Sequence, residues 1–249
     1  MRPAHLSAAP PVVLVAHGSR DPRAAAATRA LAGAVASVSP GRQVLPSWLD
    51  HTDPRPAEVL RGLVAAGHDR AVLVPLLLTA AYHRKVDIPA AVAAAGAGLR
   101  VRVTDVLGPV GGAVDARLLA GLRRRLAEAT AGESAGPDAV VLAAAGTRDP
   151  AARASVGRVA AAFGAGLGVP CRVSYASAAP PEVGDAVARL RAAGARRVAV
   201  AAYFLAPGRF HDGVRATAHA AGAVAVADPL TDLPELADLV RRRVDAAAA

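Results

Sequence analysis

Two histidines and an aspartate stand at the ends of three predicted strands in the first half of the chain. His17 directly follows the first apolar run, Asp50 follows the second, and His83 lies in the polar loop after the third. The carboxyl ends of parallel strands meet at one edge of a sheet, so we expect these side chains to share that edge. Two imidazoles and a carboxylate can hold a divalent metal ion with open coordination positions, or act as base and electrostatic partner. The sequence leaves both kinds of site open.

Neighbouring residues offer alternatives for each role. His51 stands beside Asp50 and can replace His83 as a ligand. Asp50 can instead cap a turn, and Asp87 is placed to cap the helix that follows it. Histidine suits either a ligand or a base because its unperturbed pKa lies near neutrality.

The loop after the first strand matches no nucleotide-binding or hydrolase motif. It lacks the Gly-Lys-Ser/Thr ending of a P-loop and the spacing of a dinucleotide fingerprint. Ser19 does not lie in a G-x-S-x-G elbow, which argues against a serine hydrolase. Arg20 and Asp21 are adjacent, and we interpret them as an ion pair that fixes the loop.

Short apolar runs alternate with alanine-rich or amphipathic stretches along the first half. Gly18 permits a sharp turn after the first strand, and Pro22 suits the first turn of a helix. This alternation is typical of βαβ units with right-handed crossovers, so it predicts a parallel sheet covered by helices on both faces. The expected strands begin at Val12 and cover 44–49, 71–78 and 101–106; the expected helices cover 24–38, 57–66 and 114–129, with a short one after Pro89.

The pattern restarts after a segment of linker composition at 131–138. A new apolar run begins at Ala139 and ends in Gly-Thr-Arg-Asp-Pro, which repeats the Gly-Ser-Arg-Asp-Pro of the first half. Ala145 stands where His17 stands in the first copy, and the run 198–205 corresponds to the third strand. We interpret this as the internal duplication of a whole domain.

The predicted fold class is therefore α/β, with two similar three-layer lobes, each a parallel sheet flanked by helices. We assign residues 1–130 to an N-terminal lobe that carries the active site and residues 139–249 to a C-terminal lobe with a degenerate site. Two similar lobes that face one another make a cleft at their interface, which is a common place for a ligand.

Composition restricts the class of partner. The net charge of +9 favours polyanions, but aromatic residues make up only 3% and offer no stacking platform for nucleic acid. An acidic small molecule fits the same charge. The single cysteine, Cys171, excludes an intrachain disulfide and a thiolate metal motif, and we expect it in a strand. The first residues lack the apolar core of a signal peptide, and no apolar run is long enough to cross a bilayer, so we expect a cytoplasmic protein.

Two motifs together resemble the sirohydrochlorin chelatase family of the class II tetrapyrrole chelatases. The first is the loop from His17 to Pro22, and the second runs from Pro75 to His83 and continues into Asp87-Ile-Pro89. The resemblance covers essentially the whole chain, because longer members also have two α/β lobes around a cleft. It implies insertion of Fe2+ or Co2+ into a carboxylate-rich tetrapyrrole, with no nucleotide and no cofactor beyond the metal substrate.

The resemblance also assigns residues. It places the two active-site histidines of the family at His17 and His83, and its acidic residue, usually glutamate, at Asp50. The metal is then held by these three residues, and the two histidines share the catalytic work of holding the ion and accepting a proton. From their places in the loops, the residues expected to bind the substrate are Ser19, Arg20, Arg84, Arg209 and His211.

The leading hypothesis is a ferrochelatase of sirohaem synthesis. The first alternative is a cobaltochelatase of cobalamin synthesis, because the same histidines serve either metal. The second is a protein that binds a tetrapyrrole or a metal without catalysis. Nucleic acid and membranes are not expected partners, and the sequence leaves the oligomeric state open.

Overall fold

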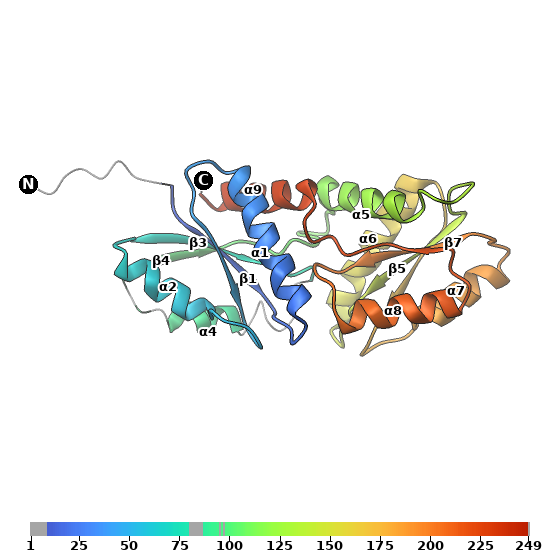
Figure 1. Cartoon of the computed structure of the whole chain (residues 1–249), viewed down its shortest axis with the longest axis horizontal. Helices are drawn as coiled ribbons and strands as arrows, with labels where there is room; N and C mark the ends of the chain where they lie inside the picture. The colour runs from blue at the N-terminus through green and yellow to red at the C-terminus, as the bar shows by residue number, and fades with distance from the viewer. Residues whose placement is uncertain (1–8, 80–86, 95, 97, 249) are drawn as a thin grey trace, which may run out of the picture.

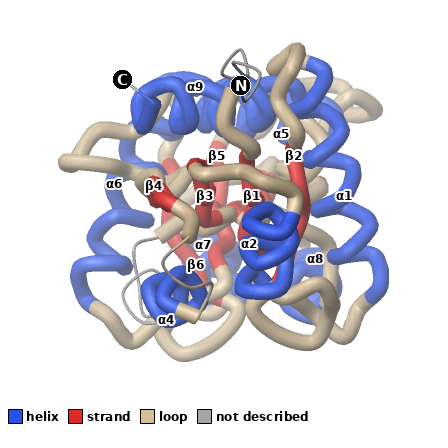
Figure 2. Tube along the Cα trace, turned by 90° about the vertical axis from the view of Figure 1, so that its left-hand side faces the viewer, coloured by secondary structure: helices blue, strands red, loops and turns tan. Residues whose placement is uncertain are grey.

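The structure, a computed structural model, describes residues 9–79, 87–94, 96 and 98–248. It contains two four-stranded parallel sheets side by side (Figure 1), surrounded by helices when viewed from one end (Figure 2). The strand order is β2-β1-β3-β4 in the first sheet and β6-β5-β7-β8 in the second. The duplicated α/β architecture predicted from the sequence is therefore confirmed.

The elements alternate as expected in both halves. The first half contains β1 Val12–Ala16, α1 Pro22–Ser37, β2 Val44–Trp48, α2 Pro56–Ala65, β3 Arg70–Pro75, α4 Asp87–Ala93, β4 Arg100–Val103 and α5 Ala116–Ala129. The second half contains β5 Ala139–Ala144, α6 Pro150–Leu167, β6 Cys171–Tyr175, α7 Val183–Ala192, β7 Val198–Tyr203, α8 Arg209–Ala220, β8 Ala225–Val226 and α9 Pro234–Ala248.

The third strand is shorter than predicted. The apolar run continues to Leu78, but β3 ends at Pro75, and the N–H of Leu77 donates to the Pro75 carbonyl at 2.9 Å. This three-residue turn takes the backbone out of the sheet. Hydrophobicity alone cannot reveal the end of such a strand, because Leu76 beyond it is buried and Leu77 and Leu78 are partly buried.

The repeated loop motif builds the same helix start in both lobes. Asp21 caps α1 by accepting a hydrogen bond from the N–H of Arg23, and Asp149 caps α6 in the same way. Proline occupies the first helical position in both. The prediction of an Arg20–Asp21 ion pair was wrong: the Asp21 carboxylate pairs with Arg23, the second residue of α1.

The last helix of each half packs on the other half. Figure 1 shows α9, from the end of the chain, lying over α1 and β3, while α5 lies beside α6 and β7. Leucines of α5 join residues of both sheets in one continuous apolar core, with Leu122 on α5 and Leu239 on α9 both buried. Because each lobe is completed by a helix from the other half of the sequence, we expect the two lobes to be coupled closely.

Two further expectations concern single features. Cys171 lies in β6 as predicted, and burial raises the pKa of its thiol to about 12, so it stays protonated at neutral pH. Among the residues that the structure describes, no helix combines the length and apolarity needed to cross a bilayer.

Candidate functional site

A cleft of about 1170 Å³ lies between the two lobes. The first lobe contributes the loop after β1, one face of α1 and the end of β2; the second contributes Tyr175, the segment after β7 and the start of α8. His17 lines this cleft at the carboxyl end of β1, where the parallel-sheet argument places it. The cleft between lobes is therefore present as predicted, and it contains one of the two proposed catalytic histidines.

Gly18 fixes the path of the backbone next to His17. Its φ is +96°, and a Cβ at this position would lie 1.7 Å from the carbonyl oxygen of Asp50. The Asp50 N–H donates to the His17 carbonyl at 2.9 Å, so the two loops lie against each other. Gly146 has the same role in the second lobe, with φ +99° and a Cβ position 1.9 Å from the Ser177 carbonyl oxygen.

Substitution of Gly18 tests the close approach of the His17 loop to the Asp50 loop. Gly18→Ala is expected to lower the free energy of unfolding by about 3 kcal/mol, because the new methyl group meets backbone and φ is positive. Gly41→Ala is the matched control, since Gly41 also has a positive φ but open space around it. Urea unfolding measures both variants. Equal losses of stability would show that the contact with Asp50 is unimportant.

Asp50 provides a carboxylate beside His17. The backbone N–H of His51 donates to Asp50 Oδ1 at 2.8 Å, and this bond is the main cause that holds the pKa of Asp50 below its usual range. The neighbouring side chains of His51, Arg55 and His17 lower the pKa further. The carboxylate is therefore ionised at neutral pH and can attract a cation.

His17 also lines a second, smaller pocket of about 430 Å³. Asp50 and Asp87 line this pocket together with the start of α2 and one face of α4. The residues that the structure describes include no cluster of three or more His, Cys, Asp or Glu side chains arranged to hold a metal ion. His83, the other predicted ligand, lies outside the described residues, so the three-residue metal site remains a proposal.

The arginines predicted to bind substrate differ from the neighbouring Arg23 in their ion pairing. Arg20 from the first lobe and Arg209 from the second both line the cleft and are exposed. Within the described part of the chain, neither guanidinium has an ion-pair partner, whereas Arg23 beside them pairs with two carboxylates. Two free guanidinium groups on opposite walls are well placed for an anionic ligand.

Of the remaining residues predicted to bind substrate, Ser19 and His211 both border the cleft. Ser19 lines the cleft, and its Oγ accepts a hydrogen bond from the N–H of Asp21. His211 also borders the cleft but is only 3% exposed, and its Nε2 lies 3.0 Å from the Ala227 carbonyl oxygen. A carbonyl only accepts, so Nε2 carries the proton and donates. Arg84 lies outside the described residues.

Comparison with known protein families identifies the chain. The family model CbiX matches residues 11–129 and again residues 139–247, one match for each half. The chain belongs to the CbiX family. A search of curated proteins found no match.

Solved structures show that the CbiX fold extends over the whole chain. SirB from Bacillus subtilis with Fe3+ has a TM-score of 0.81 at 20% identity, covering 96% of this chain and 95% of that one. SirB from Bacillus subtilis subspecies spizizenii in complex with cobalt has a TM-score of 0.76 at 20% identity, covering 95% and 94%. A CbiX described as the terminal enzyme of sirohaem biosynthesis in denitrifying bacteria has a TM-score of 0.69 at 22% identity, covering 96% and 100%.

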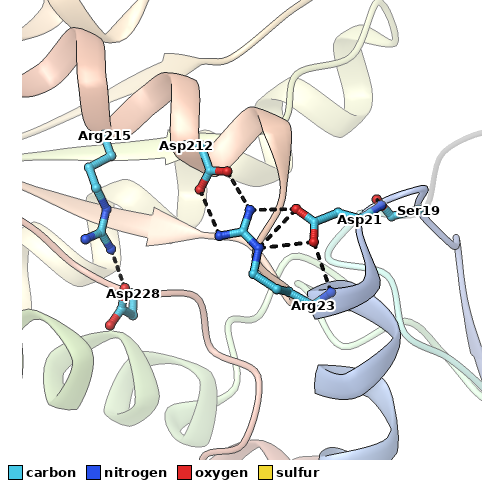
Figure 3. A network of polar contacts seen from close by, with 6 residues as sticks. All are labelled: Ser19, Asp21, Arg23, Asp212, Arg215 and Asp228. Carbon is cyan, nitrogen blue, oxygen red and sulfur yellow. Dashed lines mark hydrogen bonds and ion pairs between the residues drawn. The ribbon is translucent and has the colours of Figure 1, made fainter.

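In this CbiX chain an ion pair crosses the cleft. This ion pair was not predicted from the sequence. Figure 3 shows the Arg23 guanidinium between Asp21 of its own lobe and Asp212 of α8, with Nη2 2.6 Å from a carboxylate oxygen of each. Arg215, one turn further along α8, pairs with Asp228. The Arg23–Asp212 pair connects α8 to the start of α1, next to the His17 loop, whereas the Arg215–Asp228 pair lies within the second lobe. Residues so far apart in sequence give no local signal of such a pairing.

The second lobe also holds the segment that leads toward His83. The Tyr203 hydroxyl donates to the Leu78 carbonyl at 3.1 Å, and burial raises the pKa of this phenol. Gly108 lies against the same carbonyl, where a Cβ would come within 1.9 Å of the oxygen. The last described residues before this segment are thus fixed by contacts from both lobes.

Proposed function

We propose that this protein is a sirohydrochlorin chelatase, which inserts a divalent metal ion into the tetrapyrrole. The observation that carries the proposal is the interlobe cleft of a CbiX-family chain. His17, Arg20 and Arg209 all line this cleft, which has a volume of about 1170 Å³. A carboxylate-rich macrocycle matches that charge and needs a cleft of this kind rather than a narrow pocket.

The two arginines hold and orient the substrate. Arg20 and Arg209 come from opposite lobes, so carboxylates on different sides of the macrocycle can reach them together. A guanidinium binds a carboxylate through two parallel hydrogen bonds, which fixes direction as well as position. Because both side chains are exposed, we expect their contribution to depend on ionic strength.

His17 lines both pockets and binds the metal ion. The smaller pocket contains the ionised Asp50 and also Asp87, which attract a hydrated cation; the larger cleft receives the macrocycle. A neutral imidazole replaces water on the ion and holds it toward the ring nitrogens. We propose that His83 faces the same ion or ring as second imidazole.

The reaction releases two protons for each metal ion. Two pyrrole N–H bonds break, the electron pairs bind the ion, and the charge of the ion is balanced by the departing protons. An imidazole that is not holding the metal can accept a proton and pass it to water. His17 and His83 divide these roles, and no nucleotide or redox partner is needed.

Fe2+ is the metal we favour, and Co2+ is the alternative. Proteins of similar fold have been solved with Fe3+ and with cobalt, and imidazole ligands suit both metals.

Multiple turnover tests the proposal. Catalytic amounts of the protein are mixed with sirohydrochlorin and Fe2+ without oxygen, or with Co2+, and the absorbance of the macrocycle is followed. Many metallated products per protein, formed faster than without protein, are expected. A change that stops at one macrocycle per protein would contradict catalysis and favour a binding protein.

A further inference from the structure

An aromatic side chain of the second lobe is exposed in the cleft. In the part of the chain that the structure describes, the exposed large apolar side chains are Val38, Val64 and Phe210, and Phe210 is 50% exposed. Only Phe210 of these lines the cleft, in the first turn of α8. An apolar ring in a ligand cleft gains free energy when a ligand covers it.

The two residues that follow Phe210 hold this turn of α8 in place. The His211 side chain donates to the Ala227 carbonyl and packs edge-on against Phe204, with ring centroids 6.0 Å apart. Asp212 reaches across the cleft to Arg23, which is itself bound to Asp21 in the loop of His17 (Figure 3). The backbone that carries Phe210 is therefore fixed both to its own lobe and to the loop that carries His17.

Because the chain is duplicated, the position of Phe210 in the second lobe can be matched to a position in the first lobe. The pairing of β1 with β3 places Val15 opposite Pro75, and the equivalent pairing of β5 with β7 places Ala143 opposite Ala202. Phe210 lies eight residues beyond Ala202, and His83 lies eight residues beyond Pro75. By this count, Phe210 occupies the sequence position of His83.

Both imidazole positions of the first lobe thus carry apolar residues in the second. Ala145 stands at the position of His17, and Phe210 at that of His83. Neither side chain can bind a metal ion or move a proton. The second wall of the cleft keeps the architecture of the first but offers an aromatic ring instead of ligands.

We propose that Phe210 contacts the substrate directly, its ring packing on the conjugated macrocycle and holding it toward His17 on the opposite wall. The inference rests on the proposed function and deepens it by assigning the two lobes different tasks. The first lobe binds the metal and accepts the protons, and the second lobe positions the macrocycle. Offset or edge-on packing of an aromatic side chain on a conjugated ring gives this contact its specificity.

Binding of metal-free sirohydrochlorin tests the proposal. Trp48 is the single tryptophan of the chain and lines the cleft, so quenching of its fluorescence reports macrocycle binding without any metal. Phe210→Ala is expected to raise the Kd of the macrocycle about 10-fold, and Phe210→Tyr, which keeps a ring, to stay within about 3-fold of the wild type. The KM for the metal is expected not to change.

Two further variants complete the comparison. Phe210→Leu keeps an apolar side chain but loses the ring, so it isolates the contribution of ring packing. It also serves as the test if Phe210→Ala lowers the stability of the protein. We expect the Kd of Phe210→Leu to be close to that of Phe210→Ala. Val38→Ala is the matched control, an exposed apolar residue outside the cleft lining. Wild-type binding by both the alanine and leucine variants of Phe210 would overturn the inference. The proposed function itself would fail on a different result, namely no turnover by the wild type.

Discussion

His17→Ala is expected to lower the rate of metal insertion by about 100-fold or more, the usual effect of removing a group that holds or transfers a proton at the reacting centre. Binding of the macrocycle is expected to stay within about 3-fold of the wild type, because the free guanidinium groups remain. The imidazole is exposed at the end of β1, so its loss creates no cavity in the core. Stopped-flow absorbance gives the rate, and Trp48 fluorescence gives the Kd.

His68→Ala is the control for this substitution. His68 lies just before β3, at the opposite edge of the same sheet, and we expect wild-type insertion rates from its variant. Added imidazole is expected to restore part of the activity of His17→Ala and to leave His68→Ala unchanged. Insertion by His17→Ala at close to the wild-type rate would contradict the proposed role of His17.

Reversal of both free cleft charges has the second largest expected effect. The double variant Arg20→Glu with Arg209→Glu is expected to raise the KM for sirohydrochlorin about 100-fold, because two charge-assisted hydrogen bonds are lost and replaced by repulsion. The KM of the wild type is expected to rise with salt, and that of the double variant to rise less or fall. Initial rates at several salt concentrations measure both effects.

The duplication supplies a matched control for the charge reversal. Arg148 occupies the position of Arg20 in the second lobe and is exposed, but it does not line the cleft. Arg148→Glu changes the net charge as much as one of the cleft substitutions does. An equal rise in KM from this variant would mean that the arginines act through overall charge and not through contact with the substrate.

Much of the fold follows from local patterns in the sequence. The aliphatic runs at Val12 and Ala139 become the central strands because only parallel strands buried on both faces are apolar at every position. The placement of His17 beside Asp50 follows from the same argument, since both stand at carboxyl ends of neighbouring strands. The repeated Asp-Pro after each loop is also a local signal, a helix cap followed by a proline.

The arrangement of the lobes does not follow from such patterns. The apolar stripe of α5, with Leu118 and Leu122, shows that this helix must cover a sheet but not which of the two sheets. The exchange of α5 and α9 is decided by packing between distant parts of the chain. The same holds for the Arg23–Asp212 pair and for Phe210, whose exposure is known only once the cleft is formed.

The position of the bound metal ion in a crystal tests whether His17 binds the metal. Crystals of the protein are soaked with Co2+ together with metal-free sirohydrochlorin, and anomalous diffraction at the cobalt edge locates the ion. We expect a peak at a bonding distance of about 2.1 Å from an imidazole nitrogen of His17, with the macrocycle in the cleft between the lobes. A cobalt ion bound elsewhere, with the His17 ring free, would contradict this expectation.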